Sequence, residues 1–192
     1  MFKQLRNNLL APARRLLPGR LAHRFARAED AAAAVEFALV AAPFLALLFA
    51  ILETALVFFA GQSLEAAATD AGRLIMTGQA QNGAYSQNDF KTAVCNALAG
   101  GLFDCTNGVT VDVQSYASFQ DVGTAVATTP INNGQLDTSK IGYVPGGPGA
   151  IVVVRLYYQW PIYLSLLNNN LANLSNGDRL LVATSVFRNE PF

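Results

Sequence analysis

One long apolar segment constrains this chain more than any other feature. Residues 37–60 are 24 positions that include a single charged side chain, Glu53. A helix of that length measures about 36 Å, which exceeds the roughly 30 Å hydrocarbon core of a bilayer. No other stretch of the sequence is apolar for as long. The sequence therefore predicts one membrane-spanning helix.

The charges are distributed unequally around this segment. Seven Lys or Arg residues precede residue 29 with no acid among them, which leaves six cations and all 13 acids for the remainder. The positive-inside rule places residues 1–30 in the cytoplasm and the residues after about 60 across the membrane. The tail either lies on the anionic inner leaflet or is a flexible topology signal. The acidic body argues against a nucleic-acid partner.

A cleavable secretory signal is the alternative explanation of a basic start followed by an apolar run. Such signals have a short basic region and an apolar core of about 7 to 15 residues. Both regions are longer here. We therefore expect the helix to be retained as an anchor.

The helix is expected to run from residue 31 to about 77, with a kink at Pro43 and Gly78 as its C-terminal cap. Beyond the bilayer its pattern becomes amphipathic. The predicted apolar face consists of Leu64, Ala67, Ala68, Ala71, Leu74 and Ile75. We divide the chain into a tail (1–30), a long helix (31–78) and a periplasmic domain (79–192).

The remaining residues predict a small α+β domain. Asp89 is the expected N-cap of a short helix that ends at residues 100–101. Residues 109–113 alternate as a half-buried strand, residues 151–158 form a central strand and residues 180–187 form the last strand. Residues 120–149 are expected to be irregular with one weak strand, and residues 162–167 to form a helical turn. The predicted fold is a long helix followed by an antiparallel sheet.

Two cysteines lie in the part placed outside the cytoplasm. Cys95 and Cys105 are the chain's only thiols, and two thiols in a small oxidised domain usually pair. We favour a disulfide, and the alternative is two buried free thiols.

Residues suited to catalysis or metal binding are scarce. The only histidine, His23, lies in the basic tail, and two cysteines alone do not complete a zinc site. We expect no enzyme activity, cofactor or metal, although scattered acids leave a hydrolase open. A binding module for a small ligand is the main alternative function, with a pocket formed by Tyr157, Tyr158, Trp160 and Tyr163.

Two features of the long helix suggest contacts with other helices. Glu36 and Glu53 are acids at the margin of the bilayer and inside it, where they are either solvated at an interface or paired. Small residues also recur at every fourth position, a pattern that allows membrane helices to approach closely, although a chain this rich in alanine could produce it by chance. This ridge includes Ala38, Ala42, Ala46 and Ala50.

Motifs at both ends resemble a known family. Residues 32–43, AAAVEFALVAAP, are similar to the N-terminal signature of TadE-like pseudopilins of tight-adherence (Tad, or Flp) pilus systems, within the type IV pilin superfamily. Residues 154–161, VRLYYQWP, resemble the family's strand with a Tyr-x-Trp-Pro motif. Residues 183–192, ATSVFRNEPF, resemble its closing RNEP segment.

The resemblance implies a single-pass protein of the bacterial inner membrane that serves pilus assembly and cell adhesion. Its implied partners are other pilin or pseudopilin subunits, pilus-assembly proteins and a prepilin peptidase. The peptidase would cut between Ala31, where the pattern usually has glycine, and Ala32. Glu36, followed by Phe37, would then neutralise the amino terminus of a neighbouring subunit. An uncleaved chain would be a signal-anchored assembly factor with the same topology.

Overall fold

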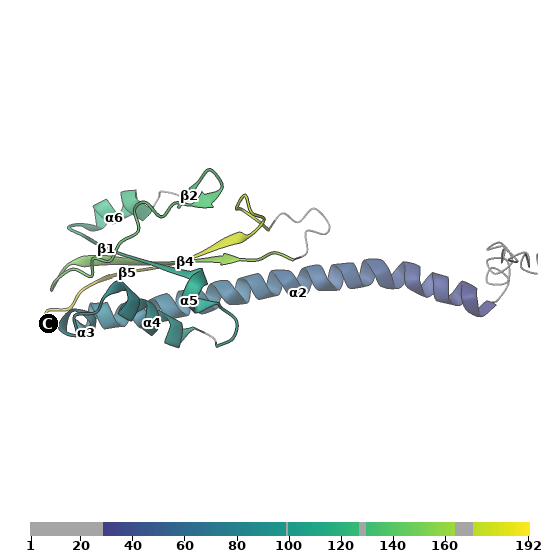
Figure 1. The fold of residues 1–192 in the computed structure, drawn as a ribbon, viewed down its shortest axis with the longest axis horizontal. Coiled ribbons are helices and arrows are strands. Elements are labelled where there is room, and N and C mark those ends of the chain that lie inside the picture. The colour runs from purple at the N-terminus through teal and green to yellow at the C-terminus, as the bar shows by residue number, and fades with distance from the viewer. Residues whose placement is uncertain (1–28, 99, 127–129, 164–170) are drawn as a thin grey trace, which may run out of the picture. The chain divides into compact units, whose positions relative to one another are not determined.

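The computed structural model describes residues 29–98, 100–126, 130–163 and 171–192 (Figure 1). Residues 1–28 of the predicted cytoplasmic tail and residues 164–167 of the predicted turn lie outside these residues, whereas Glu29 and Asp30, which were assigned to the tail, begin the long helix. The helices are α2 (Glu29–Met76), α3 (Gln79–Asn82), α4 (Gln87–Ala97), α5 (Cys105–Gly108) and α6 (Phe119–Val126). The strands are β1 (Val109–Tyr116), β2 (Ile131–Asn132), β3 (Gln135–Leu136), β4 (Ile151–Trp160) and β5 (Arg179–Arg188).

The long predicted helix is confirmed as α2. It contains Pro43 within its span and ends just before Gly78, whose φ of 75° is the left-handed conformation that favours glycine. The Gly78 N–H donates to the carbonyl of Ile75 at 3.0 Å, which satisfies one of the last helical acceptors. Gly78 therefore has the capping role that the sequence predicts.

The chain divides into two compact units between Leu47 and Leu48. The first contains the N-terminal part of α2, and the second contains the rest of α2 and all the other elements. Within the described part of the chain, one helix, Ala32–Met76, is long and apolar enough to cross a membrane. This fits the predicted single-pass anchor.

Three antiparallel strands form the sheet in the order β1-β4-β5. The predicted central strand is confirmed, because β4 pairs with β1 over residues 151–158 and with β5 over residues 151–160. Val154 stands opposite Val113 of β1 and Ser185 of β5, so these three residues share one face. The predicted α+β class is therefore correct.

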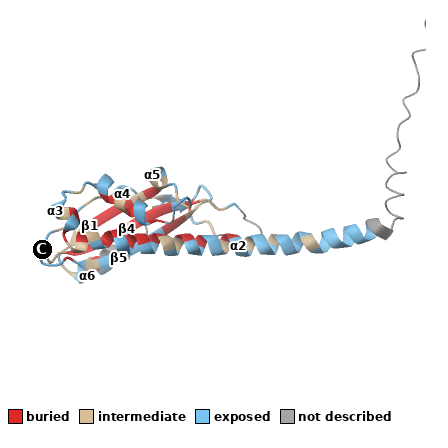
Figure 2. Cartoon of the chain, turned by 90° about the horizontal axis from the view of Figure 1, so that it is seen from below, coloured by how far each residue is buried: buried red, intermediate tan, exposed pale blue. Residues whose placement is uncertain are grey.

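The two faces of the sheet have different covers (Figures 1 and 2). The C-terminal part of α2 and helix α4 cover one face. Its core includes Leu64, Ala67, Ala68, Ala71, Ile75, Phe90, Val94, Val113, Val154, Leu156 and Leu181. On the opposite face, Val122 of α6 packs on Ile151 and Val153, and the β2–β3 hairpin packs near Tyr157. The predicted apolar face of the helix is thus the main contact of the sheet.

Two local predictions were wrong. The N-cap of α4 is Ser86, not Asp89, because the Ser86 hydroxyl accepts from the Asp89 N–H at 3.3 Å while Asp89 binds the Ser86 N–H at 2.9 Å. Helix α6, residues 119–126, overlaps the start of the segment 120–149 that was predicted to be irregular. Its start is held by Ser118, which bonds the N–H and carboxylate of Asp121 at 3.2 and 2.7 Å.

Candidate functional site

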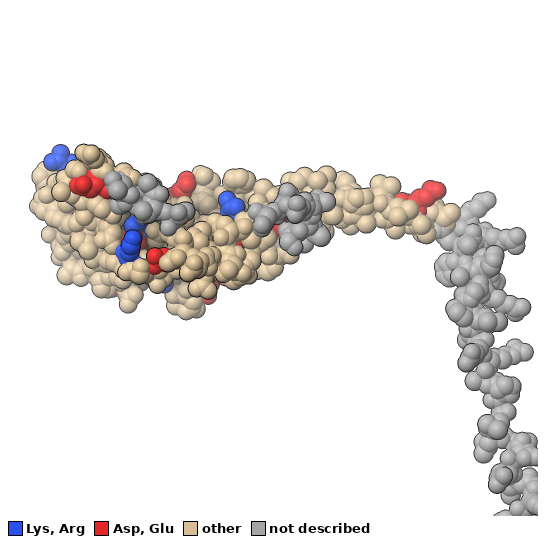
Figure 3. All heavy atoms as spheres, turned by 90° about the horizontal axis from the view of Figure 1, so that it is seen from above, with Lys and Arg blue, Asp and Glu red and all other residues tan. Residues whose placement is uncertain are grey.

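The N-terminal part of α2 presents an apolar surface on all sides. Phe37 is 75% exposed, and most large side chains as far as Leu52 are also exposed. In Figure 3 the helix carries no Lys or Arg side chain along this stretch. A soluble protein rarely exposes so much contiguous apolar surface, which marks this helix as a membrane or helix-packing surface.

The acid and the small residues predicted to act in assembly all lie on this surface. Glu36 is exposed two turns inside α2, and no described side chain forms a hydrogen bond or ion pair with it. Ala38 and Ala42 are exposed, whereas Ala46 and Ala50 are half-buried. Ala31 and Ala32 lie in the first turn of α2. The exposed side chains of Glu36, Ala38 and Ala42 are therefore placed where another helix can reach them.

Glu53 has a different environment from Glu36. It is only 8% exposed, and its Oε1 accepts a hydrogen bond of 2.7 Å from the Tyr163 backbone N–H, just after the Trp160-Pro161 pair. Pro161 follows the end of β4 and has no backbone N–H to continue the strand pairing. Two residues later, the backbone N–H of Tyr163 is directed to the helix. The carboxylate therefore binds its own chain, a long-range contact that no pattern in the sequence indicated.

The disulfide between Cys95 and Cys105 is confirmed. Cys95 lies in the last turns of α4 and Cys105 begins α5, with their Cα atoms 5.7 Å apart. The bond fixes the connection that leads from α4 into β1. It stabilises the domain mainly by restricting the unfolded chain.

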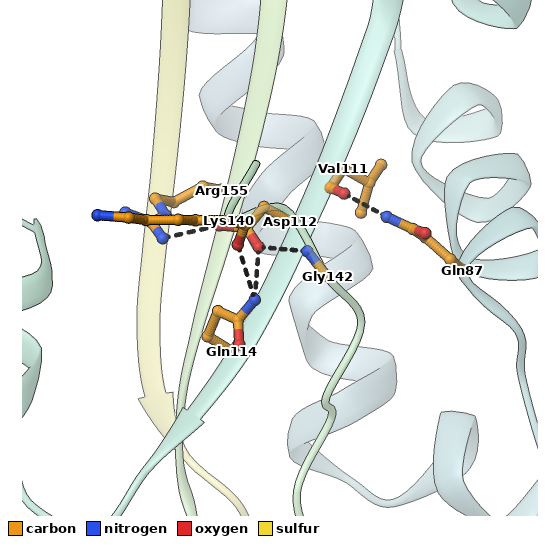
Figure 4. A network of polar contacts seen from close by, with 7 residues as sticks. All are labelled: Gln87, Val111, Asp112, Gln114, Lys140, Gly142 and Arg155. Carbon is orange, nitrogen blue, oxygen red and sulfur yellow. Dashed lines mark hydrogen bonds and ion pairs between the residues drawn. The ribbon is translucent and has the colours of Figure 1, made fainter. Parts of the chain in front are cut away.

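A buried ion pair connects β1 and β4 (Figure 4). Asp112 is 1% exposed, and its Oδ2 contacts Arg155 Nη2 at 2.7 Å and Nε at 3.0 Å. Its Oδ1 accepts from Gln114 Nε2 at 2.9 Å and from the Gly142 N–H at 3.0 Å. Both oxygens are fully engaged, which suits a structural contact better than proton transfer. The alternation of β1 gave no reason to expect this burial.

The C-terminal segment is fastened to the glycine-rich loop at 145–149. Asn189 Nδ2 donates to the carbonyls of Pro145 and Gly147, both at 3.0 Å. The Glu190 N–H donates to the carbonyl of Met76 at 2.9 Å, at the end of α2. The RNEP residues therefore join the last strand, the loop and the helix end, a structural role that the motif alone did not reveal.

The aromatic residues proposed as a ligand pocket do not gather in one place. Tyr158 and Trp160 pack with Phe103 on the helix-covered face, at ring-centroid distances of 4.9 and 6.0 Å from Phe103. Tyr157 lies on the opposite face, where burial raises its pKa above the usual value. Tyr163 is 82% exposed. The proposed four-residue pocket is therefore not formed.

Among the described residues, no group of three or more His, Cys, Asp or Glu side chains could hold a metal ion. Several acids instead accept hydrogen bonds from backbone N–H groups at helix ends and turns. The Ser86 hydroxyl and N–H, for example, hold the pKa of Asp89 below its usual value by hydrogen bonding to its carboxylate.

Comparison with known proteins agrees with the character of the long helix. The model of the family described as "TadE-like protein" matches residues 31–73, which is 43 of the 192 residues. No curated protein and no solved structure matches the chain. The matched segment begins at Ala31, contains Glu36 and the alanine ridge, and ends within the part of α2 that packs on the sheet. The sequence of this helix is therefore similar to that of the TadE-like family.

Proposed function

We propose that the chain is a minor pseudopilin or pilus-assembly protein of a tight-adherence pilus. The TadE-like helix associates it with this system. One observation carries the finer proposal: apolar side chains of α2 are exposed from Val35 to Leu52, whereas Leu64 and Ile75 of the same helix are buried in the domain. The exposed part packs with other pilin-like helices, and the domain makes protein contacts outside the membrane.

The proposed topology follows from charge and from redox chemistry. The seven cations before residue 29 orient the single span of the inner membrane with its amino terminus in the cytoplasm. The domain then lies in the periplasm, where the Cys95–Cys105 disulfide can form and persist. The two arguments are independent and agree.

Helix packing is the proposed mechanism of assembly. Each fourth residue is displaced by about 40° around a helix, so three or four members of the alanine ridge can face one neighbour. Small side chains there allow close contact between backbones. Glu36 would pair with the amino terminus of a neighbouring subunit and set the register of the helices.

Processing by a prepilin peptidase is part of the proposal. A cut between Ala31 and Ala32 would put Glu36 at mature position five and Phe37 at position six. The scissile bond lies in the first turn of α2, where the backbone N–H groups have no intrahelical acceptors and the helix opens most readily. Mass spectrometry of the amino terminus of the membrane-extracted protein distinguishes the cleaved subunit from an uncleaved assembly factor.

Deletion of the chain tests the proposed function. We expect the deletion strain to lack tight-adherence pili by electron microscopy and to regain them with the full-length protein. A reporter enzyme fused after Phe192 should be active only on the periplasmic side. Normal piliation of the deletion strain would contradict the proposed function, and cytoplasmic reporter activity would contradict the topology.

A further inference from the structure

The outer edge of β5 is open. β5 is the last strand in the order β1-β4-β5, so within the described chain only its other edge pairs with a strand. The N–H of Asn189 faces the β4 side, where it donates to the carbonyl of Ala150 at 2.8 Å. The N–H of Leu180 instead donates to Asn173 Oδ1 at 2.7 Å. Backbone groups alternate along an antiparallel strand, so residues 182, 184 and 186 direct theirs to the open edge.

The side chains along this edge suit a strand partner. Val182 and Val186 are each 42% exposed, and Thr184 between them is also exposed. β-branched residues on an unpaired edge form a template for a further strand. On the other side of the same edge, a groove of about 430 Å³ lies between β5 and α2. Its lining includes Thr54, Phe58, Gly61, Gln62, Arg179 and Val182.

An arginine lies at each end of β5, with Asp178 just before Arg179 and Glu190 two residues after Arg188. Arg179 Nη1 donates to the carbonyl of Leu171 at 2.9 Å, and Arg188 Nε donates to that of Gly149 at 3.1 Å. Neither guanidinium forms an ion pair with a described residue, and β5 itself contains no acid. The two arginines are nine positions apart, which is about 30 Å along a strand. A partner with carboxylates at matching positions would complement both ends.

A second copy of this chain does not fit this edge. β5 runs in the same direction as α2, because Arg179–Val182 line the groove beside Thr54–Glu65 and Glu190 binds Met76 at the end of the helix. Copies in one membrane share the direction of α2, so antiparallel pairing of two β5 edges would invert one copy. Parallel pairing in register would place Arg179 beside Arg179 and Arg188 beside Arg188, which is repulsive.

We propose that the open edge of β5 binds an extended segment of a different protein, with alternating apolar residues and a carboxylate near each end. The segment adds a fourth strand to the sheet and extends into the groove beside α2. This inference rests on the proposed function, because the exclusion of a second copy requires that all copies cross one membrane in one direction.

Photo-crosslinking of the full-length protein in living cells tests the partner. A photoreactive amino acid replaces Val182 in one strain and Thr92, which is exposed on α4, in a control strain. We expect the first strain alone to give a crosslink, and peptide mapping to place it in an extended acidic and apolar segment of another protein. A crosslink to a second copy, to a helical segment or to nothing would overturn the inference.

Two variants at Thr184 test the backbone contact. Thr184→Pro removes one outward N–H and leaves the pairing with β4 intact, whereas Thr184→Val keeps the N–H and the branched shape. We expect the Val182 crosslink to fall about fivefold in the first variant and to persist in the second. The Cys95–Cys105 bond and the abundance of both variants serve as controls for folding. Equal crosslinking by the two variants would overturn the inference.

Charge exchange tests the two ends. Arg188→Glu should reduce the crosslink, and replacing the mapped carboxylate of the partner by Lys should restore it. If the Lys replacement in the partner does not restore the crosslink, the assignment of the charged ends is overturned. If deletion of the chain abolishes pili while Thr184→Pro leaves both pili and the crosslink normal, the edge inference fails and the proposed function stands.

Discussion

The two parts of α2 differ in whether their apolar side chains are exposed or buried. From Val35 to Leu52 the large apolar residues are exposed, whereas from Val57 to Ile75 the apolar face is buried in the domain core. The acid just before the apolar segment and the acid within it divide in the same way. Glu36 is exposed, and Glu53 binds the backbone of Tyr163. One continuous helix can therefore serve assembly at one end and folding at the other.

The difference explains why hydrophobicity alone does not define the role of a residue in this helix. The N-terminal part is apolar all round, which suits lipid or another helix. The C-terminal part places polar residues such as Glu65 and Asp70 opposite its buried stripe, which suits a protein core on one side and water on the other. Substitutions in the two parts should accordingly have different consequences.

The largest effect should come from truncating a buried side chain of the C-terminal part. Leu64→Ala removes a fully buried side chain and should lower the free energy of unfolding of the domain by about 3 kcal/mol. Leu47→Ala, in the exposed part, is the matched control and should change it by less than about 0.5 kcal/mol. Denaturant unfolding of the detergent-solubilised protein measures both. Equal losses would show that the two parts do not differ as described.

Loss of the disulfide should affect the domain and spare the anchor. The double variant Cys95→Ser, Cys105→Ser should destabilise the domain by about 2 to 3 kcal/mol, because a loop of this length restricts the unfolded chain by that amount. The protein should nevertheless remain in the membrane fraction, since the exposed apolar helix is unchanged. Release into the soluble fraction would contradict the independence of anchoring and domain folding.

A smaller effect is expected at Glu53. Glu53→Gln replaces a charge-assisted hydrogen bond to the Tyr163 N–H with a neutral one, which should cost about 1 kcal/mol of domain stability. The equivalent change at Glu36 should leave domain stability unaltered, because no hydrogen bond or ion pair joins that side chain to a described residue. Thermal unfolding of the two variants measured side by side tests the contrast. Identical melting temperatures for the two variants would contradict it.

The last effect appears only at high pH and concerns Tyr143, which lies in the domain and has no counterpart in the exposed part of α2. Burial raises its pKa to about 12 from the ordinary 10, so the neutral phenol is the form that the fold favours. Its contribution to stability is complete below pH 10 and is lost as the pH rises towards 12. Tyr143→Phe should flatten this decline in unfolding measurements between pH 9 and 12, and an unchanged decline would assign it to another group.

Sequence patterns predicted the large elements well because these depend on periodicity. The spacing of Leu64, Ala67, Ala71 and Ile75 predicted the buried face of α2, and the β-branched run in β4 predicted the central strand. The anchor and the disulfide followed from composition and residue count. These features arise from interactions that are local in the sequence or from pairs with no alternative partner.

Contacts between distant segments were beyond such patterns. Nothing near Glu53 or Asp112 in the sequence indicates that the partners are the Tyr163 N–H and Arg155, which are 110 and 43 residues away. Helix α6 was missed because its glycine- and threonine-containing sequence resembles a loop. Its helical state depends on the Ser118 cap and on packing of Val122 against the sheet. The partners of Glu53 and Asp112 and the helical state of α6 therefore depend on tertiary contacts, which local sequence patterns do not contain.

Piliation by a Glu36→Gln strain tests most directly the claim that the exposed part of α2 acts in assembly. Glutamine keeps the size and most of the polarity of the side chain, so insertion and abundance should be normal, as they should be in the control Asp70→Asn on the domain part of α2. If Glu36 pairs with a neighbouring amino terminus, electron microscopy should show few or no pili in the first strain and normal pili in the control. Normal piliation by a stably inserted Glu36→Gln protein would contradict the account.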